Sequence, residues 1–120
     1  MRALILLPIV LAATAAAQQP RSVEVRLSNF DFTPDRIVLR AGEPVLLHLV
    51  NSSGGGHDFS APRFFAAASN VSGPVHDGEV DVPSHGSVDV RLTPARGTYR
   101  LRCTHILHST FGMTGQIVVQ

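Results

Sequence analysis

Three side chains that can bind a soft metal ion lie close together near the C-terminus. They are Cys103, His108 and Met113, in the spacing Cys-x4-His-x4-Met. A fourth candidate is His57, which follows a Gly-rich run and which we expect at the end of a different strand. Two imidazoles, one thiolate and a weak thioether form the ligand set of blue-copper sites, where sulfur favours Cu(I) and imidazole also accepts Cu(II). The residue types and their spacing therefore indicate one copper site that can hold both oxidation states.

Cys103 is the single cysteine of the chain. One Cys excludes an internal disulfide, four-Cys zinc sites, iron–sulfur ligation and the Cys-x-x-Cys redox motif. A metal bond accounts for an unpaired thiol in an oxidising compartment, because the metal ion deprotonates and occupies it. His105 is close enough to Cys103 to compete as a ligand. We expect it to support the site or lie at the surface, since choosing it leaves seven residues before Met113.

The first residues have the organisation of an export signal. A short positive start, Met1-Arg2, precedes an apolar run over residues 3–11, and small residues continue to Ala17. This order predicts a secretory signal peptide, residues 1–17, and a mature domain, residues 18–120. The apolar run is shorter than the roughly 20 residues that span a bilayer. We expect a bacterial protein of the periplasm or the exterior, with no membrane span in its mature chain.

Composition limits the class of protein. Hydrophobic residues make up 44% of the chain and charged residues 16%, which excludes a mainly disordered protein. All ten basic residues are Arg, and nine acidic residues nearly balance them. This balance gives no electrostatic basis for binding nucleic acid or an anionic membrane surface. The length fits one domain, which we expect to act as a monomer.

Alternating apolar and polar residues recur along the mature chain, and period two is typical of strands with one buried face. The segments with this pattern are residues 23–28, 37–40, 45–50, 87–92, 98–103 and 114–119. Residues 51–60 and 69–78 read as irregular, and a short helix is possible near residues 64–69. Short strands separated by turns predict an all-β Greek-key sandwich or barrel of about seven to eight strands. Alternation also places Tyr99, Leu101 and Cys103 on one face of their strand.

The sequence resembles the cupredoxin family in two segments. Residues 99–119, YRLRCTHILHSTFGMTGQIVV, are similar to the copper loop and last strand of cupredoxins with longer loops. Residues 29–34, NFDFTP, followed by Ile37 and Ala41-Gly42, are similar to the first strands of bacterial periplasmic cupredoxins. The resemblance implies copper held by His57, Cys103 and His108, with Met113 axial. It also implies that the exposed edge of His108, surrounded by apolar residues such as Phe111, is the exit for the electron.

Two positions depart from related proteins. Cupredoxins commonly have Asn after the first His ligand, where it ties the two ligand loops together, and this chain has Asp58. An ionised carboxylate there would favour Cu(II) and lower the reduction potential. Multicopper oxidases have a His directly after the Cys ligand, which leads to a trinuclear cluster. This chain has Thr104 at that position.

Three functions fit a copper site of this kind. We expect an electron carrier that docks transiently on redox partner proteins. The alternative is a protein that exchanges copper with copper-handling partners for delivery or buffering, which usually requires Met- or His-rich exposed sites. The chain has only Met1 and Met113. An oxidase or nitrite reductase needs another copper centre, and the remaining His residues form no His-x-His pair, so we expect no enzyme activity.

Overall fold

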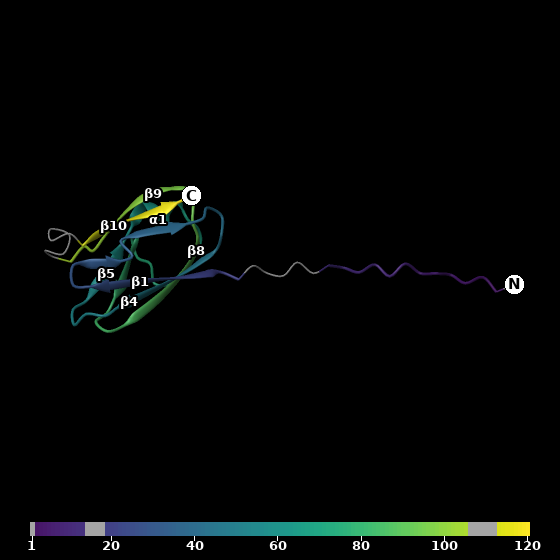
Figure 1. Ribbon diagram of the computed structural model, residues 1–120, viewed down its shortest axis with the longest axis horizontal. Helices are drawn as coiled ribbons and strands as arrows, with labels where there is room; N and C mark the ends of the chain where they lie inside the picture. The colour runs from purple at the N-terminus through teal and green to yellow at the C-terminus, as the bar shows by residue number, and fades with distance from the viewer. Residues whose placement is uncertain (1, 14–18, 106–112) are drawn as a thin grey trace.

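The computed structural model describes residues 2–13, 19–105 and 113–120. Within these ranges the chain forms two five-stranded sheets that are packed as a sandwich (Figure 1). The strands are β1 (Arg21–Ser28), β2 (Asp31–Thr33), β3 (Arg36–Leu39), β4 (Val45–Asn51), β5 (His57–Ser60), β6 (Ser69–Ser72), β7 (Glu79–Val82), β8 (Ser87–Thr93), β9 (Gly97–Arg102) and β10 (Thr114–Val119). One short helix, α1 (Pro62–Ala67), follows β5.

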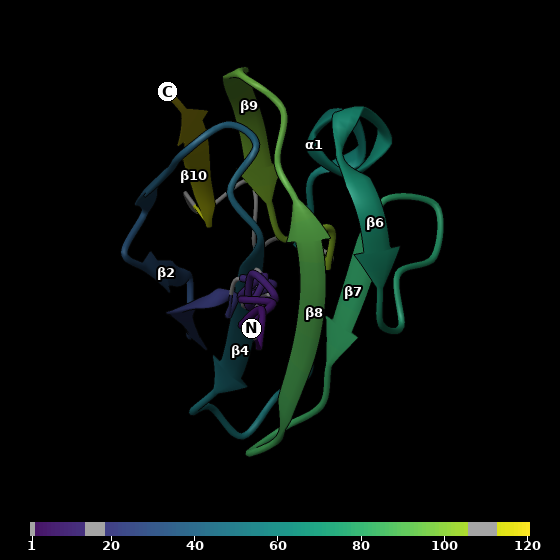
Figure 2. The ribbon, with the colours of Figure 1, turned by 90° about the vertical axis from the view of Figure 1, so that its right-hand side faces the viewer.

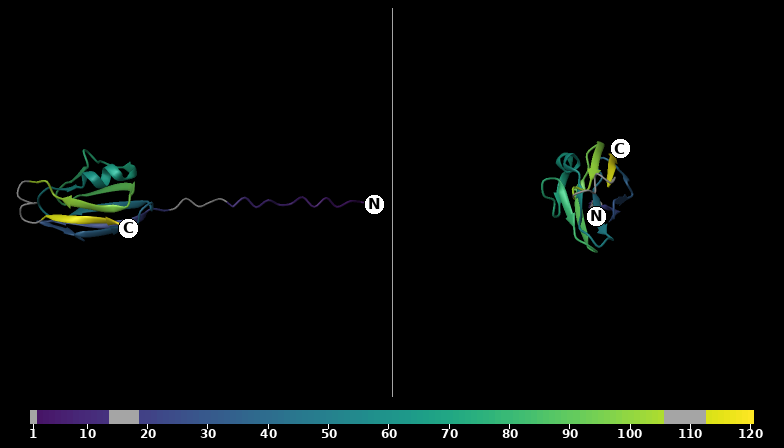
Figure 3. Two further views of the ribbon diagram at one scale, coloured as in Figure 1. Left: turned by 90° about the horizontal axis from the view of Figure 1, so that it is seen from above. Right: turned by 90° about the vertical axis from the view of Figure 1, so that its left-hand side faces the viewer.

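The sheets bring together strands that are far apart in the chain. One sheet has the order β2-β1-β4-β8-β6, and the other has the order β3-β10-β9-β5-β7. The pairs β1–β4 and β3–β10 are parallel, and the other pairs are antiparallel. Figures 2 and 3 show the two layers and the crossing connections. The predicted all-β sandwich is confirmed, and its order places β5 directly beside β9.

The strand predictions were right for the segments with a clear alternation of apolar and polar residues, and four further strands were missed. All six alternating segments are strands, but residues 51–60 and 69–78, expected to be irregular, contain β5 and β6. All four residues of β5 are buried, and all four residues of β6 are exposed. A strand with the same environment on both faces has no alternation for the sequence to reveal. The short strands β2 and β7 were also missed, although each has one buried face.

The core is filled by the inward side chains of both sheets and by α1. Phe59 lies between Phe32 and Phe65, with ring centroids 6.1 Å from each. Phe64 and Phe65 of α1 are buried and belong to this core. The start of α1 packs closely against Gly78, whose φ is +77°. A Cβ atom at this position would be only 2.4 Å from the Cα of Pro62. Only glycine allows this close approach.

The N-terminal segment has no regular structure in residues 2–13, and its large apolar side chains are at least 80% exposed. Ala17, the predicted last residue of the signal peptide, lies outside the described residues. Among the described residues, no helix is long and apolar enough to cross a membrane.

Candidate metal centre

His57 and Cys103 meet at the ends of two neighbouring strands. His57 begins β5, Cys103 directly follows β9, and both are buried. The alternation of β9 turns Leu101 inward and both of its Arg side chains outward, as predicted. The Nδ1 atom of His57 is 3.8 Å from the Sγ atom of Cys103. Two candidate ligands separated by 46 residues are therefore adjacent.

This separation fits a shared metal ion. A first-row metal such as zinc binds sulfur at about 2.3 Å and imidazole nitrogen at about 2.0 Å. At an angle of roughly 120° between those bonds, the two donor atoms are about 3.8 Å apart. The observed distance between His57 and Cys103 is 3.8 Å, so the two side chains are positioned to bind one ion without rearrangement of the strands.

Met113 lies beside Cys103 at the start of β10. The backbone N–H of Cys103 donates to the carbonyl of Met113 at 3.1 Å, and both residues are fully buried. This hydrogen bond brings the backbones of Cys103 and Met113, two of the predicted ligands, next to each other. His108, the other predicted ligand, and Phe111 lie outside the described residues.

Asn51 holds the loop that leads into His57. Its side chain is buried and donates to the carbonyls of Gly55 and Val82 at 2.8 and 3.0 Å. Its Oδ1 atom accepts bonds from the N–H and the hydroxyl of Ser53. Asn51 was not among the residues that we expected at the site. The available signal was its place at an inward position of a strand, where a polar side chain needs partners.

Asp58 joins the two strands that carry His57 and Cys103. Its buried carboxylate accepts the backbone N–H of Thr104 at 2.7 Å and also the hydroxyl of Thr104. Both oxygens therefore accept hydrogen bonds from the residue that follows Cys103. The Asp side chain makes the connection between loops that the family resemblance implies for an Asn at this position.

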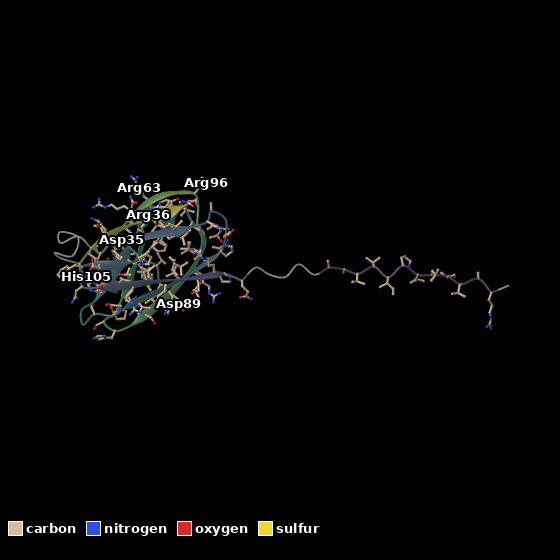
Figure 4. The ribbon with its side chains drawn as sticks, in the orientation of Figure 1. Asp35, Arg36, Arg63, Asp89, Arg96 and His105 are labelled. Carbon is tan, nitrogen blue, oxygen red and sulfur yellow. The ribbon has the colours of Figure 1, made fainter. Side chains whose placement is uncertain are left out.

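His105 lies next to Asp58 rather than far from the site. Its Nε2 atom is 3.8 Å from the Oδ2 atom of Asp58, and its ring centroid is 6.3 Å from that of His57. Asp81, opposite Asp58 on β7, completes a group whose ligand atoms lie within 4.8 Å of one another. The side chain of His105 is 41% exposed, at the end of the domain away from the N-terminal segment (Figure 4). The structure thus places His105 beside the centre, and its supporting role stays a prediction.

Burial raises the pKa of the Cys103 thiol above its ordinary value. The nearby negative charge of Asp58 adds to this rise, because it disfavours a second negative charge. The backbone N–H groups of Asp58 and His105 oppose the rise by hydrogen bonding to the sulfur. The fold thus keeps the thiol protonated without a metal, but supplies donors that stabilise a thiolate once a metal is bound.

The structure describes three further His residues. His48 is on the outer face of its sheet, where its Nδ1 atom is 2.5 Å from the Oδ1 atom of Asp89 on the neighbouring strand. His76 and His85 are exposed in turn-like segments.

Comparison with known proteins identifies the family. A family model described as the cupredoxin-like domain matches residues 1–119. The chain belongs to the cupredoxin-like domain family. No curated protein sequence matches it.

Solved structures of other cupredoxins have the same fold. Auracyanin B is 26% identical, with a TM-score of 0.66, and the match covers 88% of this chain and 93% of auracyanin B. Auracyanin A, a "blue" copper protein from Chloroflexus aurantiacus, is 20% identical, with a TM-score of 0.60 over 85% of this chain and 100% of the other. A multicopper oxidase from Aquifex aeolicus is 14% identical, with a TM-score of 0.67 over 90% of this chain but 31% of the oxidase.

Proposed function

We propose that this cupredoxin is a mononuclear type 1 copper protein that carries electrons, with copper alternating between Cu(I) and Cu(II). The observation that carries the proposal is the buried pair of His57 and Cys103, whose donor atoms are 3.8 Å apart beside a buried Met113. The family membership and the likeness to the auracyanins support the same function.

In this proposal His57, Cys103 and His108 would hold the copper, with the thioether of Met113 as a weak fourth ligand. Bound copper would supply a one-electron couple. The chain's contribution is to keep its donor atoms in place in both oxidation states. β5 and β9 fix His57 and Cys103, while Asn51 and Asp58 fix the adjoining segments by hydrogen bonds. Little rearrangement then accompanies the gain or loss of an electron.

Burial of the ligands favours the electron carrier over the alternative of copper delivery. His57 is 1% exposed, and Cys103 and Met113 are 0% exposed. Rapid transfer of copper between proteins requires an incoming ligand to reach the metal, and these side chains offer no such access. Thr104, which is bonded to Asp58, follows Cys103 where an oxidase has its connecting His, so we propose no enzyme activity.

We also propose that the protein is exported to the bacterial periplasm or beyond and acts there as a monomer with transient redox partners. The order of residues 1–17 supports export. Cys103, the single cysteine of the chain, is also compatible with an oxidising compartment when a metal occupies its thiol.

The spectrum of the Cu(II)-loaded protein tests the proposed function. We expect an intense thiolate-to-copper charge-transfer band and a small hyperfine splitting in electron paramagnetic resonance, both recovered after reduction and reoxidation. The same spectra show which histidine is the second imidazole ligand. The His108→Ala variant should lose the band, and the His105→Ala variant should retain it. A weak tetragonal Cu(II) signal, or loss of copper on each cycle, would contradict the electron carrier and favour delivery.

Copper binding should strengthen with rising pH. Because burial raises the pKa of Cys103, the thiol is protonated at neutral pH and must release its proton to bind copper. Between pH 7 and 8 the apparent affinity for Cu(II) should rise about tenfold, with about one proton released per copper. Competition titrations with a chelator in weakly buffered indicator solution measure both quantities. An affinity independent of pH would show that the thiol is not a ligand.

The same pKa shift should make the metal-free protein less stable at high pH, whereas copper binding becomes stronger. The unfolded chain ionises its thiol at the ordinary pKa, below that of the folded state. The metal-free protein should therefore lose stability as pH rises above the ordinary thiol pKa.

A further inference from the structure

A group of arginines lies on the outer face of the sheet that carries His57 and Cys103. Arg100 and Arg102 project outward from β9, and Arg63 projects from the first turn of α1. With Ser60 and Pro62 they line a hollow of about 290 Å³, which we call the arginine hollow. Figure 4 shows Arg63 on the upper side of the domain and Asp89 on the lower side.

The arginine hollow has an excess of positive charge. The ion pairs between described residues involve Arg26, Arg40, His48 and His105, and none includes Arg63, Arg100 or Arg102. Three cations around one hollow repel one another, although solvent screens this repulsion. The mature chain is close to neutral as a whole, so this local excess is a feature of one surface and not of the composition.

The chemistry of the arginine hollow favours carboxylates presented by another protein. Guanidinium groups bind carboxylates in pairs of parallel hydrogen bonds, and Arg is enriched in protein interfaces. Ser60, the buried residue of the lining, already donates its hydroxyl to Glu79 at 3.2 Å. The negative charge of Glu79 disfavours a small anion close to Ser60. The three Arg side chains are exposed, so their guanidinium groups can bind carboxylates on a surface that docks from outside.

The arginine hollow also adjoins the candidate metal centre. Arg102 directly precedes Cys103, and Ser60, which is in register with Arg102, ends the strand that His57 begins. A protein that binds at the hollow would therefore contact Arg102, the residue next to Cys103 in the chain. We propose that the arginine hollow is the docking site for an acidic surface of a redox partner protein. This proposal rests on the proposed function as an electron carrier.

Binding of a deca-glutamate peptide to the Cu(I)-loaded protein tests the proposal. We expect amide shifts in nuclear magnetic resonance spectra to gather at residues 60–63 and 98–102. The double variant Arg63→Gln/Arg100→Gln should weaken binding about fivefold or more at low salt. The control variant Arg21→Gln/Arg91→Gln removes the same charge from exposed positions elsewhere and should weaken binding less than twofold. Equal losses in the two variants, or shifts spread over the whole surface, would overturn the proposal.

Two further measurements separate the possible sources of a positive result. Inorganic phosphate should not reproduce the pattern of shifts, and saturable phosphate binding in the hollow without peptide binding would replace the proposal with a small-anion site. Oxidation of the Cu(I) protein by hexacyanoferrate(III) should slow about threefold in the hollow variant compared with the control variant. If the protein proves to have no reversible copper centre, the proposed function fails, whereas the peptide shifts still report on the surface.

Discussion

Replacement of Cys103 with Ala is expected to abolish the coloured copper centre. The charge-transfer band requires a copper–thiolate bond, and Cys103 is the single thiol of the chain. The remaining imidazoles and thioether would hold Cu(II) more weakly and in a tetragonal geometry, with no intense visible band. Because only one buried sulfur atom is removed, the metal-free protein should lose about 1 kcal/mol of stability. Absorption spectra of the copper-loaded variant, with denaturant unfolding of the metal-free form, measure both effects.

Met113→Gln is the matched control, because it changes another buried residue of the same centre. The amide can replace the weak axial thioether, so this variant should keep the intense band while its reduction potential changes. A Cys103→Ala protein with the visible spectrum of the original would refute the site assignment. Loss of the band in both variants would show instead that the site collapses after any buried change.

Replacement of Asp58 with Ala should have the second-largest effect. The change removes both acceptors of the Thr104 N–H and hydroxyl, which connect β5 to the residue after Cys103. Loss of hydrogen bonds to a charged group should destabilise the protein by about 2–3 kcal/mol. The position of Cys103 should also become less defined, which would broaden the spectrum of bound copper. Thermal and denaturant unfolding, together with the absorption spectrum, test these effects.

Asp58→Asn separates the charge of this side chain from its hydrogen bonds. The amide oxygen can accept the Thr104 N–H, and the amide NH₂ can donate to the Thr104 hydroxyl, so stability should fall by less than about 1 kcal/mol. Removal of a negative charge near the metal should favour the reduced state by about 1 kcal/mol. This free energy corresponds to a rise in the reduction potential of roughly 40 mV for one electron. Asp81→Asn removes the same charge from an exposed neighbour and should give a smaller rise. Equal shifts in both variants would show that Asp58 acts only through the overall charge.

The longer strands whose two faces differ in burial could be predicted from the sequence. Strands β4, β8, β9 and β10 alternate and were found, whereas β5 is buried on both faces and was missed. This failure concerned the strand that carries His57. His57 was nevertheless singled out as a candidate ligand, because its chemistry and the Gly-rich run before it do not depend on secondary structure.

The supporting residues of the site could be predicted only in part. Asp58 was singled out because it stands where related proteins have Asn, and its bonds to Thr104 were found where the resemblance implied them. Asn51 was missed, because its partners Gly55, Val82 and Ser53 become neighbours only when β4, β7 and the intervening loop are assembled.

The sequence by itself determined the kind of chemistry available to this protein. A single Cys, a His and a Met at regular spacing, with another His upstream, restrict the donor set whatever the fold is. Only the tertiary structure decided that His57 and Cys103 are 3.8 Å apart and that Arg63 joins Arg100 and Arg102 around one hollow. The physical reason is that β5 pairs with β9, which brings together His57 and Cys103, 46 residues apart in the chain. Local residue patterns carry no information about which distant strands will pair.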